Sequence, residues 1–131
     1  MGTRSLTLVY DDKETLVNMY RQFDGYPSGH GKELFDFLSS GKLVNGLGND
    51  EGLVFNGMPC LAAAVVAHFK DGPGGIYLLP AKARDCGQDY EYHVYGGFDR
   101  RDVTLLVSSH GKKLFDGSLE EFGTWCDREP E

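Results

Sequence analysis

The chain has 131 residues and a mass of 14.5 kDa, the size of one ordinary globular domain. Its 13 Lys and Arg residues against 20 Asp and Glu residues give a net charge of −7, which disfavours general nucleic-acid binding because phosphate backbones would repel the chain. The longest apolar stretch, from Cys60 to Ala67, is too short to span a membrane, and we expect neither a membrane partner nor an N-terminal secretion signal. The sequence therefore predicts a single α+β domain over residues 1–131.

Cysteine and glycine usage narrows the class further. The three cysteines, Cys60, Cys86 and Cys126, are odd in number and form no C-x-x-C pair, so we expect free thiols in a reducing cytoplasm. Cys60 lies in an apolar segment and is expected in the core. The 18 glycines gather between periodic segments, which indicates short elements joined by tight turns.

Hydrophobic periodicity predicts the elements in chain order. Alternating segments predict strands at residues 4–10, 15–23, 75–80, 89–95, 103–108 and 112–115, the first two as a hairpin, with a further short strand at 53–55 in a loop-like stretch. Helical patterns predict helices at residues 30–39, 59–70 and 118–126.

These elements predict an α+β fold. We expect an antiparallel sheet of five or six strands, two helices packed on one face, and a C-terminal helix that closes an edge. The second helix is apolar nearly all round and is expected to be buried, with His68 as a satisfied core histidine. Ser118-Leu-Glu-Glu121 is a capping box that opens the third helix. Asp50 and Glu51 are expected to be loop charges.

One nine-residue pattern occurs twice. SGHGKELFD at residues 28–36 and SSHGKKLFD at residues 108–116 agree at seven positions, but their flanking sequences differ. We interpret the match as chance and expect two structures, because context overrides local propensity. The first copy would enter a helix, and His110-Gly111 of the second would form a hairpin turn.

The stretch MYRQFDGYPSGHG, residues 19–31, carries the clearest chemical signal. It runs from a strand through a Gly- and Pro-containing turn to a helix start, where free N–H groups can bind an anion. Arg21 offers a planar fork for phosphate, Tyr26 can stack on a flat base, and neighbouring polar groups can select hydrogen-bonding edges. The residues predicted to bind a ligand are Arg21, Gln22, Asp24, Tyr26, Ser28, Gly29, His30 and Gly31.

A purely structural interpretation of the same stretch stays open. Asp24-Gly25 and Tyr26-Pro27 can build a turn, Ser28 can cap the helix, and Arg21 can pair with an acidic residue. No Walker A or G-x-G-x-x-G spacing occurs, and the four histidines lack metal-ligand spacing. We assign no catalytic residue, no metal and no cofactor.

A second group of polar residues lies on the strand predicted at residues 89–95. Tyr90 and Tyr92 should face one side, and Glu91, His93 and Tyr95 the other. An acid, a base and an aromatic ring could line a pocket there, with a solvated sheet face as the alternative.

Two motifs together resemble the markers of a family of small uncharacterised proteins from bacterial and bacteriophage genomes. These are GTRSLT at residues 2–7 and the residues 19–31 motif, which cover about the first quarter of the chain. The family carries no assigned function. Its phage occurrence implies a role against host defence, since some small phage proteins sequester nucleotide-derived signalling molecules in symmetric oligomers.

The leading expectation is therefore a non-catalytic protein that sequesters a phosphorylated, nucleotide-like small molecule in the host cytoplasm, as a homo-oligomer with a dimer as the default. Arg21 and the helix N-terminus would hold the anion. The alternatives are a small hydrolase with His30 or His93 as the acid–base group, and an acidic inhibitor that binds a host protein. On the leading expectation, Arg21→Ala abolishes ligand retention and leaves the melting temperature nearly unchanged.

Overall fold

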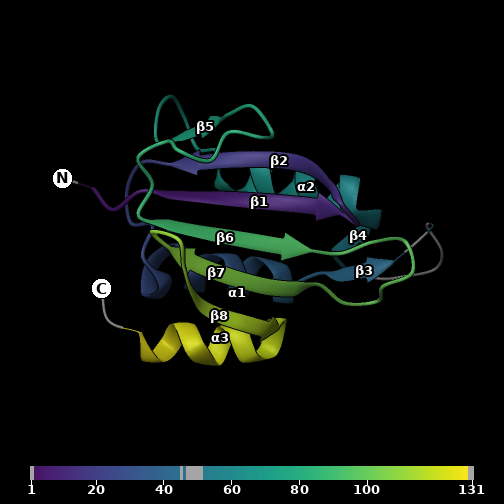
Figure 1. Ribbon diagram of the computed structural model, residues 1–131. Helices are drawn as coiled ribbons and strands as arrows, with labels where there is room; N and C mark the ends of the chain where they lie inside the picture. Colours follow the sequence, from purple (N-terminus) through teal and green to yellow (C-terminus); the bar gives the residue numbers. More distant parts are fainter. Residues whose placement is uncertain (1, 45, 47–51, 130–131) are drawn as a thin grey trace.

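A six-stranded sheet backed by three helices forms the fold in Figure 1, a computed structural model that describes residues 2–44, 46 and 52–129. Asp50 and Glu51, predicted as loop charges, lie outside the described residues. The strands follow the spatial order β5-β2-β1-β6-β7-β8. Their bounds are β1 Ser5–Asp11, β2 Glu14–Arg21, β5 Ile76–Leu78, β6 Tyr90–Tyr95, β7 Thr104–Ser109 and β8 Lys112–Ser118. The predicted α+β class is confirmed.

One pair in this sheet departs from the expected antiparallel arrangement. β1 runs parallel to β6, whereas every other neighbouring pair in the sheet is antiparallel. The chain between β1 and β6 passes through β2, both central helices and β5, so β6 can return beside β1 in the same direction. A small parallel pair, β3 (Lys42–Val44) with β4 (Val54–Asn56), lies outside this sheet, and β3 falls in the stretch predicted as loop.

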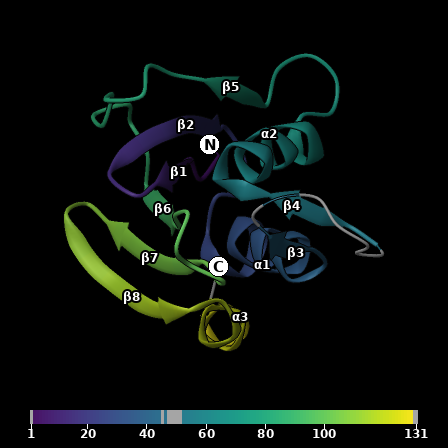
Figure 2. The same cartoon turned by 90° about the vertical axis from the view of Figure 1, so that its right-hand side faces the viewer.

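The helices cover one face of the sheet. A π-helical turn at Pro27–Gly31 continues into α1 (Lys32–Ser39), and α2 (Gly57–Phe69) lies beside it, so this helical region begins three residues earlier than predicted. Figure 2 shows α1 and α2 on the same side of the sheet, with α3 (Leu119–Arg128) next to β8. The main core lies between these helices and the side chains that β1, β2, β6 and β7 turn towards them.

α2 is buried on only one side, which corrects two predictions. Met58, Leu61 and Val65 reach the core, whereas Cys60 and His68 are exposed. The helices form a single layer, so the outer side of α2 faces solvent although it is apolar in composition. Composition alone could not distinguish this half-buried helix from a central one.

A second, smaller apolar cluster lies on the opposite face of the sheet. Leu6, Leu8 and Tyr10 of β1 are buried there. Leu79 and Cys86, from the irregular segment 79–89 between β5 and β6, pack over them. The sheet therefore has a helix-covered face and a face partly covered by the 79–89 segment.

Two local predictions are confirmed. The repeated pattern adopts two structures, because residues 28–36 form the π turn and the start of α1, while residues 108–116 form the β7–β8 hairpin with positive φ at His110 and Gly111. Ser118 and Glu121 form the reciprocal capping box at the start of α3. Among the described residues, no helix is long and apolar enough to cross a membrane.

Candidate functional site

Arg21 stands where β2 ends, on the helix-covered face of the sheet. Its Nη1 donates to Glu33 Oε2 at 2.6 Å and to His30 Nδ1 at 3.1 Å, and its Nε donates to the Phe23 carbonyl at 2.6 Å. The guanidinium carbon also lies 5.9 Å from the centre of the Phe69 ring. Only 15 % of the Arg21 side chain is exposed, so the guanidinium is held in one place by its neighbours.

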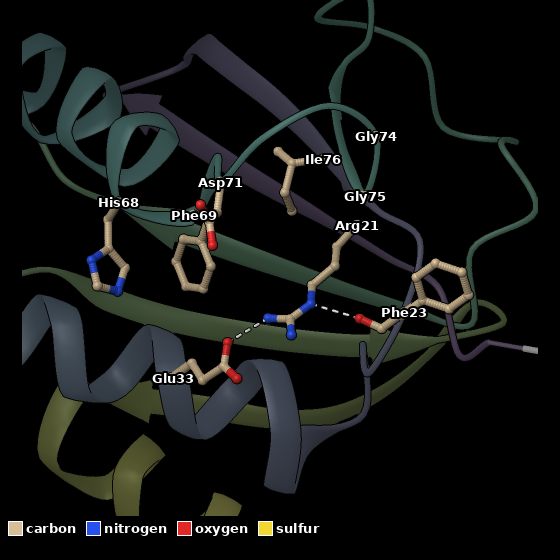
Figure 3. A pocket seen from close by; sticks show the side chains of 9 residues that line it. All are labelled: Arg21, Phe23, Glu33, His68, Phe69, Asp71, Gly74, Gly75 and Ile76. Carbon is tan, nitrogen blue, oxygen red and sulfur yellow. Dashed lines mark hydrogen bonds and ion pairs between the residues drawn. The ribbon is translucent and has the colours of Figure 1, made fainter.

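The exposed side of this guanidinium faces a shallow hollow of about 340 Å³. Figure 3 shows Arg21 between Glu33 of α1 and the Phe69 ring at the end of α2, with Phe23 and His68 further out. The 71–75 loop closes the opposite wall with the Asp71 carboxylate and the backbone of Gly74 and Gly75. The hollow thus combines one arginine, two carboxylates, aromatic surface and accessible backbone.

His30 is hydrogen-bonded to Arg21 and is completely buried. Its Nε2 lies 2.6 Å from the Thr7 hydroxyl, and its ring packs against Phe69 and Tyr92. Because arginine can only donate, Nδ1 accepts from Arg21 and Nε2 carries the proton that it donates to Thr7. Burial, reinforced by the Arg21 charge, lowers the pKa of His30 to about 3. His30 is therefore a neutral structural group that positions Arg21.

The predicted anion site at the helix N-terminus is occupied by the protein's own carbonyl groups. The backbone N–H groups of Gly29 and Gly31 donate to the Tyr26 carbonyl, and that of His30 donates to the Asp24 carbonyl at 2.9 Å. The π turn makes these bonds possible because it brings the carbonyls of the preceding loop beneath the first helical residues. The expectation that these N–H groups hold an anion is corrected accordingly.

The other predicted ligand residues do not line the hollow beside Arg21. The Gln22 backbone N–H bonds the Gly75 carbonyl, and Tyr26 packs on Gly29, where an added Cβ would lie 2.8 Å from the ring. Gly31 is buried, and a Cβ there would lie 2.8 Å from Cys126 Sγ. Ser28 does not cap the helix, because its Oγ is buried without a hydrogen-bond partner among the described residues. Of the eight predicted residues, only Arg21 lines the hollow.

The sequence analysis did not predict the residues that line the hollow opposite Glu33. His68 and Phe69 end α2, and Asp71, Gly74 and Gly75 follow in the sequence DGPGG. Three glycines in so short a loop with positive φ at Gly72, Gly74 and Gly75 were the available signal, although it does not by itself name a partner for Arg21.

Electrostatics limit what the hollow can accept. Glu33 neutralises the Arg21 charge, and Asp71 adds a second carboxylate. The Glu33 side chain is 52 % exposed, so this ion pair contributes little stability and an incoming oxyanion can replace it. An anion that binds at Nη1 displaces the Glu33 carboxylate from that nitrogen.

A second polar group, the His93 network, lies on the opposite face of the sheet. Tyr10 Oη lies 2.7 Å from His93 Nδ1, and His93 Nε2 lies 3.2 Å from Glu91 Oε1. The Tyr10 and Tyr95 rings stack with centres 4.7 Å apart. The prediction that Glu91, His93 and Tyr95 share a face is confirmed. Of these three side chains, Glu91 lines a neighbouring hollow of about 470 Å³ together with Arg4 and Arg84.

The described residues contain no cluster of His, Cys, Asp and Glu suited to a metal ion. The predicted arginine thus lies beside aromatic surface in the hollow, but the rings are those of Phe69 and Phe23 and not the predicted Tyr26. Comparisons of the chain with models of protein families, with curated proteins and with solved structures find no match.

Proposed function

We propose that this protein binds, without converting it, a small molecule that carries both a flat ring and an oxyanion, such as a nucleotide, in the hollow beside Arg21. The observation that carries the proposal is the position of the guanidinium. Three hydrogen bonds and the Phe69 ring fix it at the wall of the hollow, and a preordered guanidinium is suited to bind phosphate or carboxylate.

Each remaining wall has a part in this proposal. The Phe69 and exposed Phe23 rings offer apolar surface against which a base can stack. Gly74 and Gly75 leave the backbone open to close approach, and Asp71 can accept hydrogen bonds from sugar hydroxyls. The ligand oxyanion replaces the Glu33 carboxylate at Arg21 Nη1.

The histidine contacts favour binding over catalysis. His30 is buried with both ring nitrogens engaged, so it has no contact with a bound molecule. His93 lies on the opposite face of the sheet and is likewise engaged on both nitrogens. The hydrolase alternative therefore loses the two acid–base groups on which it was based. The expected homo-oligomer and the bacteriophage origin stay predictions.

The proposal is tested by measuring whether the protein removes a compound from solution and whether that compound is later released unchanged. The purified protein is incubated with mononucleotides, cyclic oligonucleotides and ADP-ribose derivatives, and the ultrafiltrate is analysed before and after heat denaturation of the protein. We expect one class of compound to leave the filtrate and to return intact after denaturation.

Two variants locate the site. Arg21→Lys keeps the charge but loses the planar fork, and should weaken retention by about tenfold or more. Arg101→Lys makes the same change at an exposed position outside the hollow and should leave retention unchanged. If every compound stays in the filtrate, or if both variants behave alike, the proposal is overturned. A compound that returns chemically altered identifies an enzyme instead.

A further inference from the structure

Arg4 lies just before β1, and hydrogen bonds to the residues at the start of β6 fix its backbone. The Arg4 N–H donates to Asp89 Oδ2 at 2.9 Å. The Arg4 carbonyl accepts from the N–H groups of Asp89 at 2.8 Å and Tyr90 at 3.2 Å. The half-buried Arg4 side chain therefore starts from a fixed point of the sheet.

The guanidinium of Arg4, in contrast to its backbone, has no hydrogen-bond or ion-pair partner in the part of the chain that the structure describes. Its Nε is buried, so this N–H group has lost contact with water without gaining an acceptor. Such a group costs free energy of folding. An arginine retained at this cost is suited to bind a group that comes from outside the chain.

This guanidinium borders the hollow of about 470 Å³ described above, which we call the Arg4 hollow. A Cβ added at Gly87 would lie 3.4 Å from Arg4 Nη1, so the glycine leaves room beside the guanidinium. The volume is typical of sites for small molecules. Besides these two residues, the hollow is lined by Arg84, Asp85, Gln88, Asp89, Glu91, His110 and Gly111.

Two carboxylates of this hollow are held by donors other than the Arg4 guanidinium. Glu91 Oε2 accepts from Gln88 Nε2 at 2.9 Å, and Glu91 Oε1 accepts from His93 Nε2 at 3.2 Å, since a carboxylate can only accept. Asp89 Oδ2 accepts from the backbone of Arg4. The Arg4 charge is therefore left without a direct partner although carboxylates line the same hollow.

The charges of the lining residues select the class of ligand. Three carboxylates against two guanidinium groups disfavour a phosphate with two negative charges. A single planar carboxylate, however, can bind the Arg4 fork through two parallel hydrogen bonds. Each carboxylate oxygen of the wall can accept more than one hydrogen bond, so Asp89 and Glu91 can also accept from an ammonium group.

We propose that the Arg4 hollow binds a small zwitterion with a carboxylate next to an ammonium group, as in a free amino acid. The carboxylate pairs with the Arg4 guanidinium, and the ammonium group faces the carboxylates of the wall. The residues that line the Arg4 hollow are all different from those that line the Arg21 hollow. This inference therefore does not depend on the proposed function.

The stability of Arg4→Met separates a ligand-binding role from a structural one. Methionine keeps an unbranched apolar side chain and removes the unpaired charge and the orphaned N–H group. The melting temperature of the variant, measured by scanning calorimetry, should therefore be equal to that of the wild type or higher. A lower melting temperature, or a failure to fold, would show that the guanidinium supports the fold and would overturn the proposal.

Binding is followed by NMR through the backbone amide signals of glycines that line the two hollows. Gly87 and Gly111 report on the Arg4 hollow, and Gly74 and Gly75 on the Arg21 hollow. The standard amino acids, sodium acetate and inorganic phosphate are each added alone at up to about 10 mM. We expect at least one amino acid to shift the first pair of signals and leave the second pair unchanged. Acetate and phosphate should bind about tenfold more weakly or worse, because both lack the ammonium group.

Two variants assign the binding to Arg4. Arg4→Met should weaken it by about tenfold or more, whereas Arg101→Met, at an exposed arginine outside the hollow, should leave it unchanged. Equal binding by the two variants overturns the proposal. So does acetate or phosphate that binds as tightly as the best amino acid, or the absence of any shift at Gly87 and Gly111. Shifts confined to Gly74 and Gly75 also overturn it, because they would place the amino acid in the Arg21 hollow.

Discussion

The two faces of the sheet each hold a buried histidine beside an arginine, and the histidines differ in the partner of the second ring nitrogen. His30 has no exposed surface, accepts directly from Arg21 and donates to the Thr7 hydroxyl. His93 is 9 % exposed, accepts from the Tyr10 hydroxyl and donates to the Glu91 carboxylate.

This difference separates a fixed support from a group that can titrate. Burial lowers the pKa of both histidines, but only at His93 does a carboxylate oppose the effect. His30 therefore stays neutral and holds Arg21 in place at the hollow. His93 retains a route to the charged state through the neighbouring Glu91 carboxylate.

Replacement of His30, which holds Arg21 in place, should have the largest effect on stability. His30→Ala leaves a cavity in the core and removes the hydrogen-bond partners of Arg21 and Thr7, so we expect a loss of about 3 kcal/mol or more in the free energy of unfolding. Urea denaturation measures it. His68→Ala, at an exposed histidine, is the control. Equal losses in the two variants would show that His30 is not the support described here.

Arg21→Gln should cost about 2 kcal/mol, because it leaves the buried Nδ1 of His30 without its charged donor. The hydrogen bond to His30 thus predicts a lower melting temperature, whereas the sequence alone predicted a nearly unchanged one. Differential scanning calorimetry of Arg21→Gln beside Arg101→Gln, an exposed arginine outside the hollow, measures the difference. A melting temperature unchanged in both would mean that Arg21 has no structural role.

The pKa of His30 predicts a loss of stability in acid. The folded-state pKa of about 3 lies below the ordinary value of 6.5, so the unfolded chain takes up the proton first as the pH falls. The stabilisation is complete above about pH 6.5 and decreases from there towards about pH 3, by at most about 1.4 kcal/mol per pH unit. His30→Gln should flatten this dependence relative to wild type, as measured by urea unfolding at several pH values. Parallel curves for the two proteins would refute the assignment.

Glu91→Gln should have the smallest effect on stability and the most selective effect on titration. Glutamine keeps an acceptor for His93 Nε2 but carries no charge, so the pKa of His93 should fall further while His30 is unaffected. The ring-proton chemical shifts of the four histidines, followed by NMR as the pH is lowered, separate these responses. A shift in the titration of His30, or none in that of His93, would contradict the comparison.

Local patterns predicted most of the elements. Alternation placed the strands and assigned Glu91, His93 and Tyr95 to one face, and S-x-x-E predicted the cap at Ser118. These features depend on residues close in the sequence, where periodicity and capping rules apply directly.

Features that depend on distant residues could not be predicted in the same way. The sequence gives no sign that β6 pairs in parallel with β1, or that Glu33 and the Phe69 ring meet Arg21. The motif at residues 19–31 identified the arginine but placed the anion at N–H groups that the π turn satisfies internally. Cys60 and His68 were placed in the core because α2 is apolar in composition, whereas the layer in which a helix packs decides which side is buried.

Affinity measured with Glu33→Gln tests the account of the Arg21 hollow most directly. Wild-type protein and Glu33→Gln are titrated by calorimetry with the nucleotide that the ultrafiltration experiment retains. Removal of the competing carboxylate should strengthen binding, by about threefold to tenfold for an exposed ion pair, because the oxyanion no longer displaces a charged partner. Equal or weaker binding by Glu33→Gln would contradict the account, because it would show that the ligand does not replace Glu33 at Arg21.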